Sequence, residues 1–230
     1  MEWNECDESR PLVETDSLFD CWSWFYALCR EYIFRDHTPE IVKSLFPSAR
    51  PTTGTRLLEL GCGPGFYACR LAAQMQHIET TGIDLSHKLI ERAKTRARSL
   101  QLANCKFQRA DAHDLPFESN SIDAIVVSRL FLIVPDREGI VREIFRVLKP
   151  SGRCFIAEPI SGFRTRMPLT LMWALSRLSA NPASKYREPQ QADVMRRDDF
   201  AALIRTRAWG SMQLTYDGWY QYAVCQKEAW

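Results

Sequence analysis

The fold of this chain is decided by the stretch Leu57-Leu58-Glu59-Leu60-Gly61-Cys62-Gly63-Pro64-Gly65-Phe66-Tyr67. An apolar run ends in an acidic residue and is followed by three glycines at alternate positions. Such a run is typical of a strand that is buried in a parallel sheet. Glycines lack a Cβ, which lets the backbone turn tightly and approach a ligand closely. We therefore predict a strand, a ligand-binding turn and a helix that begins at Phe66-Tyr67.

Strands and helices alternate from Thr55 onwards. Short apolar or β-branched runs predict the strands, and apolar residues at helical spacing predict the helices between them. The predicted strands cover 79–86, 106–112, 121–128 and 153–158, and the predicted helices cover 67–76, 87–100 and the residues after Pro135-Asp136. This alternation indicates an α/β fold with a doubly wound parallel sheet.

Polar side chains gather where the predicted strands end. They are Glu59, Asp84, Asp111, Ser128 and Glu158. Ligands of doubly wound sheets bind at the carboxyl ends of the strands, so we expect the functional site there. Further along, a helix is predicted from Asp198 to about Thr206. The stretches Ser211–Tyr216 and Tyr220–Lys227 flank Asp217-Gly218, which is typical of a hairpin.

Four motifs follow one another along the chain: Glu59/Gly61/Gly63/Gly65, Gly82/Asp84, Asp111/Ala112 and Arg146-Val147-Leu148-Lys149-Pro150-Ser151-Gly152. In order and spacing they resemble the class I S-adenosylmethionine (AdoMet)-dependent methyltransferases. The last motif is similar to the R-x-L-K-P-G-G turn of the type 11 branch, which includes the ubiquinone/menaquinone methyltransferases, with Ser151 replacing a glycine. The resemblance covers about Thr55 to Glu158. It implies a Rossmann-like, seven-stranded, mostly parallel sheet with a C-terminal antiparallel hairpin.

A dinucleotide site is the competing interpretation of the glycine stretch. The third glycine of its fingerprint, Gly-x-Gly-x-x-Gly, would fall at Phe66. Asp84 does not distinguish the two, because an acid after the second strand also binds a ribose in NAD enzymes. Asp111-Ala112 favours AdoMet, since a dinucleotide site has no regular need for an Asp there. An NAD(P)-dependent oxidoreductase is therefore disfavoured.

The resemblance implies how AdoMet, and its product S-adenosylhomocysteine, would be bound. Asp84 would accept hydrogen bonds from the ribose hydroxyls, and Asp111 with Ala112 would contact the adenine. Glu59 would lie close to the methionine ammonium, although a carboxylate that caps the nearby turn is the alternative. The other predicted cofactor-binding residues are Gly61, Cys62, Gly63, Gly65, Leu85 and Ser128. No metal site is predicted.

Methyl transfer from AdoMet is an in-line displacement, in which the protein mainly positions and desolvates the reactants. A phenol or enol acceptor would also need a base. Glu158 and His113 are the candidate bases, and His113 is alternatively an ordinary loop residue. Arg129 is the candidate residue for holding an anionic or carbonyl acceptor, with a surface salt bridge as its alternative.

Two segments lie outside the sheet pattern. Asp16-Ser17 is the predicted N-cap of an aromatic helix, which either packs on the main domain or forms a lid over cofactor and acceptor. Thr38-Pro39 predicts the N-cap and first residue of a short helix that Pro47 ends. Residues 160–192 contain an apolar segment and predict an inserted cap. We therefore divide the chain into a helical lid segment, 1–50, and a methyltransferase domain, 51–230.

The acceptor is predicted to be small and hydrophobic or aromatic, with O- or C-methylation favoured, because both outlying segments are rich in apolar side chains. Ser128-Arg129-Leu130-Phe131 stands where amino methyltransferases carry an Asn/Asp-Pro-Pro-Tyr run, and no Pro-Cys dipeptide of the cytosine C5 enzymes occurs. An RNA or other macromolecule methyltransferase remains the alternative because of the basic helix at 87–100. A protein that binds AdoMet without catalysis is a further alternative.

Composition limits the remaining classes. The 230 residues carry a formal net charge of +2, which is too small to indicate nucleic acid by itself. The eight cysteines contain no Cys-x-x-Cys pair, which argues against a zinc site or a disulfide framework. We find neither a signal-peptide pattern nor an apolar run long enough to span a membrane. We therefore expect a cytoplasmic protein with reduced thiols, and the sequence does not predict its oligomeric state.

Overall fold

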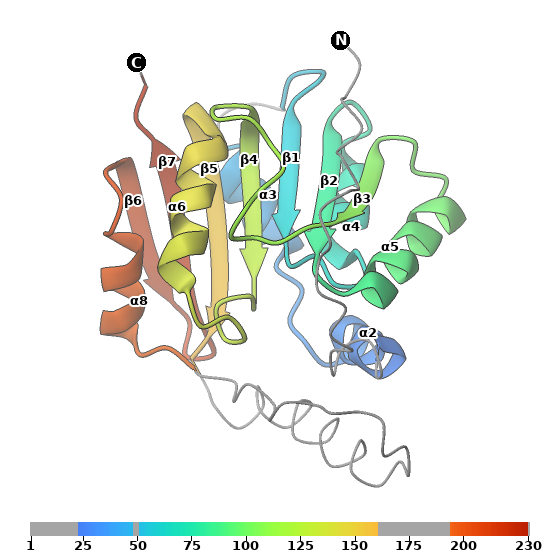
Figure 1. The fold of residues 1–230 in the computed structure, drawn as a ribbon, viewed down its shortest axis with the longest axis horizontal. Helices are drawn as coiled ribbons and strands as arrows, with labels where there is room; N and C mark the ends of the chain where they lie inside the picture. The colour runs from blue at the N-terminus through green and yellow to red at the C-terminus, as the bar shows by residue number, and fades with distance from the viewer. Residues whose placement is uncertain (1–22, 48–50, 161–193, 230) are drawn as a thin grey trace, which may run out of the picture.

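A mixed sheet of seven strands forms the centre of the molecule (Figure 1). The computed structural model describes residues 23–47, 51–160 and 194–229. The strand order is β3-β2-β1-β4-β5-β7-β6. The strands are β1 (Arg56–Leu60), β2 (Glu79–Asp84), β3 (Cys105–Arg109), β4 (Ile122–Ser128), β5 (Leu148–Pro159), β6 (Trp209–Tyr216) and β7 (Tyr220–Lys227).

The first five strands are parallel, and β7 and β6 add an antiparallel hairpin at the β5 edge. The order reverses at β1, which pairs with β2 on one side and β4 on the other. In doubly wound sheets a ligand binds beside such a reversal, at the carboxyl ends of the strands. The predicted fold class is confirmed.

Helices cover both faces of the sheet (Figure 1). They are α2 (Ser23–Tyr32), α3 (Thr38–Leu45), α4 (Phe66–Gln74), α5 (His87–Ser99), α6 (Arg137–Val147) and α8 (Arg197–Ile204). One apolar core joins α6 and α8 to the sheet, a second joins α3 and α4 to the opposite face, and a third lies between α4, α5 and β3. None of the helices in the described ranges is long and apolar enough to cross a membrane.

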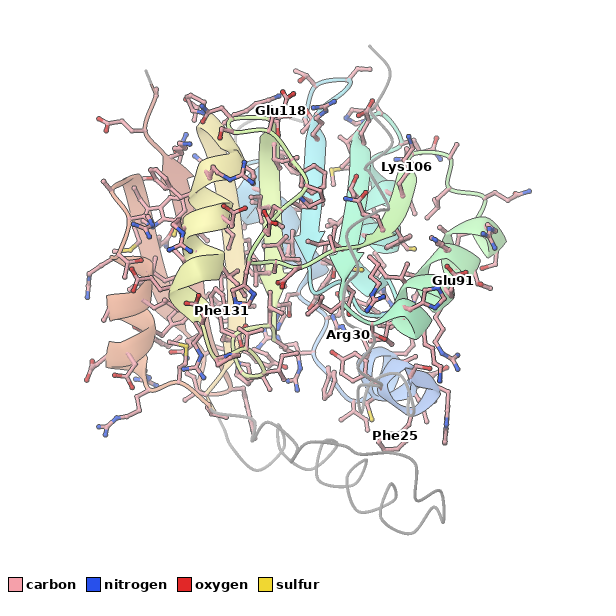
Figure 2. The ribbon with its side chains drawn as sticks, viewed as in Figure 1. Phe25, Arg30, Glu91, Lys106, Glu118 and Phe131 are labelled. Atoms are coloured by element: carbon pink, nitrogen blue, oxygen red, sulfur yellow. The ribbon has the colours of Figure 1, made fainter. Side chains whose placement is uncertain are left out.

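Helix α2 lies beyond the carboxyl ends of the central strands (Figure 1). In Figure 2, Arg30 on α2 and Phe131 after β4 both lie toward this end of the sheet, whereas Glu118 lies at the opposite end. The predicted N-cap at Asp16-Ser17 lies outside the described residues, as does the predicted cap segment except for Ile160. Of the described part of the first segment, α2 therefore lies next to the expected site, whereas α3 packs on a face of the sheet.

Two local predictions were wrong. The N-cap position of helix α3 is His37, whose side chain makes no capping bond, and Thr38 and Pro39 are the first two residues of the helix; the Thr38 hydroxyl bonds instead to Asp36 Oδ1, at 2.5 Å. The predicted turn at Lys149–Gly152 is part of β5, which begins already at Leu148. The register with β4 shifts here, because Ile122 pairs with Leu148 and Ala124 pairs with Arg153, which leaves Lys149–Gly152 as an insertion in β5.

Candidate active site

The glycine loop follows β1 and leads directly into α4. Gly63 and Gly65 have φ values of +51° and +74°, a left-handed backbone that side chains rarely adopt. A Cβ on Gly65 would stand 2.7 Å from Phe107 Cζ. The loop can therefore hold its shape only with glycine at this position, and it presents backbone at the carboxyl end of β1.

Asp84 ends β2 and faces this loop. Its Oδ2 accepts a hydrogen bond from the Gly63 N–H at 2.8 Å, and its Oδ1 accepts one from the Ser86 N–H at 2.9 Å. These two bonds orient the carboxylate at the carboxyl end of β2, beside the glycine loop. Leu85, the next residue, is half exposed at the same edge.

Glu59 is buried beneath the loop, with 3% of its surface exposed. Its Oε2 accepts a hydrogen bond of 2.7 Å from the Ala68 N–H in the first turn of α4. Burial raises the pKa of the Glu59 carboxyl to about 8, although the bond from Ala68 opposes the change. The carboxyl therefore caps the helix, as the alternative interpretation expected, and it is largely protonated near neutral pH.

Asp111 and His113 form a compact turn after β3. Asp111 Oδ1 accepts the His113 N–H at 2.9 Å and also lies 2.8 Å from His113 Nδ1. His113 Nε2 lies 2.9 Å from the Asp136 carbonyl oxygen at the start of α6. Both imidazole nitrogens therefore have partners within the fold, which favours the loop interpretation of His113 over a base. Ala112 is buried, as is Cys62 in the glycine loop.

Tyr26 of α2 lies directly over the glycine loop. A Cβ on Gly63 would be 3.1 Å from Tyr26 Cε1. Burial raises the pKa of the Tyr26 phenol, and the charges of Arg129, Arg30, Asp84 and Glu59 also act on it. The sequence did not single out Tyr26, and its only signal was the aromatic density of the predicted helix.

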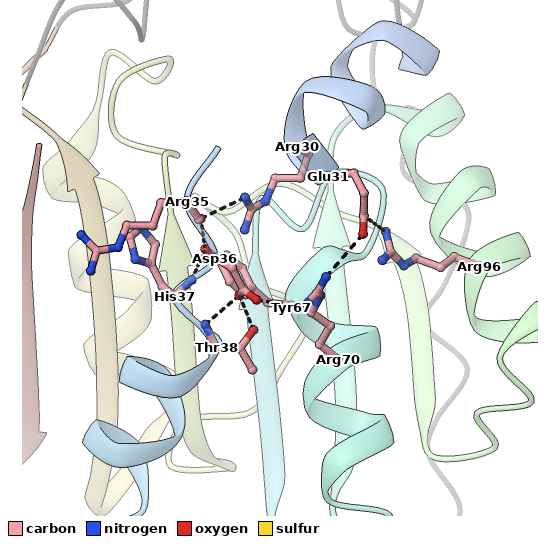
Figure 3. Close-up of polar contacts among 9 residues, drawn as sticks. All are labelled: Arg30, Glu31, Arg35, Asp36, His37, Thr38, Tyr67, Arg70 and Arg96. Atoms are coloured by element: carbon pink, nitrogen blue, oxygen red, sulfur yellow. Dashed lines mark hydrogen bonds and ion pairs between the residues drawn. The ribbon is translucent and has the colours of Figure 1, made fainter. Parts of the chain in front are cut away.

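Polar contacts hold α2 and the segment after it to α4 and α5 (Figure 3). Glu31 pairs with Arg96 of α5 at 2.9 Å and with Arg70 of α4 at 3.4 Å.

Two further contacts hold α2 in place. The Arg30 guanidinium lies 3.9 Å from the centre of the Phe66 ring, at the start of α4. Arg92 of α5 donates to the Ser23 hydroxyl at 2.9 Å. These contacts place α2 as a cover on the glycine loop.

Arg129 and Ser128 lie at the end of β4. Arg129 is 8% exposed, and its guanidinium stands 3.7 Å from the centre of the Phe34 ring and 3.3 Å from the Tyr220 hydroxyl. This burial contradicts the surface salt bridge that was the alternative for Arg129. Ser128 lies close to the Tyr67 phenol, whose pKa burial raises to about 12.

Glu158 is buried near the end of β5. Its Oε1 accepts a hydrogen bond of 2.9 Å from the Phe131 N–H, and it thereby supports the loop after β4. Burial raises the pKa of the Glu158 carboxyl to about 7, despite this bond and the nearby charge of Arg129. The group could exchange a proton near neutral pH, while its only hydrogen-bond partners in the described residues are backbone groups of the loop.

The structure thus brings the predicted residues to one edge of the sheet. Asp84 bonds to the glycine loop and Glu59 to the helix after it, Asp111 follows β3 on one side, and Arg129 with Glu158 lies on the β4–β5 side. No group of three or more His, Cys, Asp or Glu side chains that could hold a metal ion is found within the described ranges.

The comparisons with known proteins agree with this geometry. A family model for the methyltransferase domain matches residues 51–205. A ubiquinone/menaquinone biosynthesis C-methyltransferase of Vibrio cholerae is 30% identical over 178 residues, which are 73% of this chain and 67% of that protein. The chain spans only 39% and 43% of the length of two other methyltransferases that it matches.

Two solved structures share the fold at low sequence identity. A Haemonchus contortus phosphoethanolamine N-methyltransferase in complex with AdoMet has a TM-score of 0.67 at 16% identity, covering 91% of this chain and 57% of that one. The [4+2]-cyclase SpnF has a TM-score of 0.69 at 18% identity, covering 93% and 94%. The family match and the sheet topology together confirm the predicted class: this chain belongs to the methyltransferase-domain family and has the Rossmann-like fold of AdoMet-dependent methyltransferases.

Proposed function

We propose that this chain transfers the methyl group of AdoMet to a small hydrophobic or aromatic acceptor, at oxygen or carbon. The observation that carries the proposal is the Asp84 carboxylate, which two backbone N–H groups orient beside a glycine loop at the sheet's reversal point. Family membership supports methyl transfer, and the Vibrio cholerae relative, named for ubiquinone and menaquinone biosynthesis, supports a small acceptor.

The described residues fit AdoMet. Asp84 would hold the ribose, with Leu85 beside it, and Asp111 with Ala112 would hold the adenine. The glycine loop, Gly61 to Gly65 with Cys62, would follow the methionine part, and the buried Glu59 would lie next to its ammonium. When bound, the cofactor supplies a sulfonium methyl group that is reactive without help from the protein.

The work of the protein would be to position the reactants and exclude water. Within the predicted lid segment, 1–50, helix α2 is proposed as the lid, because its Tyr26 lies against the glycine loop, whereas α3 packs in the core. Ser128 would line the site at the end of β4, and Arg129 would hold the acceptor. Glu158, with its raised pKa, is the proposed proton acceptor, whereas His113 is occupied on both nitrogens.

Nucleic acid is the weaker choice of acceptor. The basic helix α5 directs three of its cations at protein partners, with Arg92 on Ser23, Lys94 on Glu91 and Arg96 on Glu31. These side chains are therefore not arranged as a free row for phosphates. We also propose a cytoplasmic location, because the six cysteines in the described residues are buried free thiols.

Thermal unfolding with AdoMet, S-adenosylhomocysteine, NADH and NADPH in parallel tests the cofactor. A ligand at about 100 times its Kd stabilises the native state by about 2.7 kcal/mol. We expect the first two ligands to raise the Tm and Asp84→Ala to abolish the shift. Asp198→Asn, an exposed acid of α8, is the control that should retain it. A shift with a nicotinamide nucleotide instead would refute the proposal.

Turnover separates catalysis from binding alone. The SpnF likeness shows that a protein named as a cyclase shares this fold, so the fold does not by itself establish methyl transfer. We expect S-adenosylhomocysteine to accumulate when the chain is given AdoMet with a panel of phenols and quinols. AdoMet binding with no product across that panel would favour the non-catalytic alternative.

A further inference from the structure

Arg129 is held in an unusual backbone conformation. It has a φ of +61°, in the left-handed region that non-glycine residues rarely adopt. Its N–H donates to the Ala157 carbonyl oxygen at 3.0 Å, which holds this residue, the first after β4, against β5. Residues in such conformations persist where the surrounding structure determines them, and they concentrate at functional sites.

The partners of the Arg129 guanidinium are neutral. It lies 3.7 Å from the centre of the Phe34 ring, and its Nη1 is 3.3 Å from the Tyr220 hydroxyl. Among the described residues, no carboxylate forms an ion pair with it. A buried cation without a counter-ion is unfavourable unless something compensates for the lost water.

The nearby acid does not fill that role. The charge of Arg129 acts to lower the pKa of Glu158, but Glu158 Oε1 accepts its hydrogen bond from the Phe131 N–H, at 2.9 Å. Because burial raises the pKa of Glu158 to about 7, much of its negative charge is absent near neutral pH. Within the described residues, Glu158 therefore neutralises the charge of Arg129 only in part near pH 7.

The residue after Arg129 lies against the glycine loop. Leu130, the next residue, lies against Gly61, where an added Cβ would stand 3.0 Å from Leu130 Cδ1. Tyr26, which covers Gly63, lies within the field of Arg129. Arginine has five N–H donors in a planar fork, of which Tyr220 occupies one among the residues that the structure describes. The remaining donors and the rings of Phe34 and Tyr26 suit a planar anion.

We propose that the acceptor is an aromatic compound with an anionic oxygen, and that Arg129 binds this oxygen beside the Phe34 and Tyr26 rings. The inference rests on the proposed methyltransferase function and adds the charge of the acceptor to it. Arg129 is then a specificity residue that distinguishes anionic acceptors from neutral ones of the same shape.

Matched probes test the charge. Titration calorimetry on the chain saturated with S-adenosylhomocysteine would compare benzoate with benzamide, and 4-nitrophenolate with nitrobenzene. We expect each anion to bind at least tenfold more tightly than its neutral partner. Arg129→Met should remove the preference and Arg129→Lys should keep part of it. Arg197→Met should leave it intact, because Arg197 lies over the Tyr216 ring on exposed α8.

The outcomes distinguish a failure of the inference about the acceptor's charge from a failure of the proposed methyltransferase function. Equal affinity for anion and neutral partner in the wild-type chain, or a preference that survives Arg129→Met, would overturn the inference alone. A wild-type chain that does not bind S-adenosylhomocysteine would overturn the proposed function as well. If Arg129→Met weakens S-adenosylhomocysteine but not 5′-methylthioadenosine, the anion is the cofactor's own carboxylate and the inference is wrong.

A second variant covers the case in which Arg129→Met does not fold. Tyr220→Phe removes only the hydroxyl that contacts Nη1. It should lower the affinity for benzoate severalfold, leave the affinity for benzamide unchanged and leave S-adenosylhomocysteine binding intact. An unchanged benzoate affinity in this variant would count against the proposed geometry.

Discussion

Binding of S-adenosylhomocysteine is expected to displace a proton from Glu59. The carboxyl is 3% exposed, and burial raises its pKa to about 8. In the ligand-free chain at pH 7 it is therefore about 90% protonated. The ligand brings an ammonium group next to it in the proposed site, and a nearby positive charge favours the ionised carboxylate. Binding and proton release are thus coupled.

The size of the coupling follows from the pKa change. Suppose that the ammonium returns the pKa of Glu59 from about 8 to its ordinary value of 4.5. The ligand then binds the chain with an ionised Glu59 about 5 kcal/mol more favourably than the chain with a protonated Glu59. Affinity should then rise about tenfold for each pH unit between about pH 5 and pH 8, because the free chain holds the proton and the complex does not.

Calorimetry at pH 7 in phosphate and in Tris measures this directly, since the two buffers take up protons with different enthalpies. We expect release of about 0.9 proton per site. Glu59→Gln should release none, and neither should 5′-methylthioadenosine, which lacks the ammonium. Equal heats in both buffers, or the same release from Glu59→Gln, would refute the placement of Glu59 at the ammonium.

Three further predictions concern stability and the cover. In the ligand-free chain the free energy of unfolding should fall as pH rises from 4.5 towards 8, because native Glu59 keeps a proton that the unfolded chain loses. Urea titrations should find that the free energy of unfolding depends less on pH in Glu59→Gln. Gly63→Ala should lower the free energy of unfolding by about 1–2 kcal/mol, because a side chain is strained at this positive φ. In the double variant with Tyr26→Ala, only the part of the loss that comes from the clash with the Tyr26 ring should be recovered. Glu31→Gln should change stability by less than about 1 kcal/mol, since the pairs are partly exposed, yet speed amide exchange in α2; unchanged exchange would argue against a cover held by these pairs.

Much of the site could be predicted because topology determines it. In a parallel sheet the carboxyl ends of all strands meet at one edge, so the acids after β1, β2 and β3 had to lie together once the strands were recognised. Glu59, Asp84 and Asp111 are therefore visible from the alternation of strands and helices alone. The glycine spacing adds the loop that connects them.

The cover and the acceptor side depend on tertiary packing and were harder to predict. Nothing in the aromatic pattern of α2 indicates that Tyr26, rather than Trp24, lies on Gly63, because both belong to one broad apolar stripe. Trp24 is 51% exposed instead. The burial of Arg129 depends on Phe34 and Tyr220, which lie far from it in sequence.

Local rules failed where two elements compete for the same residues. Lys149-Pro150-Ser151-Gly152 has the composition of a turn and lies within the bounds of β5, but the pairing with β4 passes from Leu148 to Arg153 without these four residues, and Ser151 has a φ of +63°. Thr38-Pro39 has the composition of a helix start, but the Thr38 hydroxyl bonds to Asp36, and the N-cap position falls one residue earlier, at His37.

A crystal structure of the chain with S-adenosylhomocysteine tests the central claim most directly. We expect density over the glycine loop, with the ribose hydroxyls within hydrogen-bond distance of the Asp84 carboxylate and the adenine beside Asp111. The ligand bound elsewhere, or an empty loop in crystals grown with saturating ligand, would contradict it.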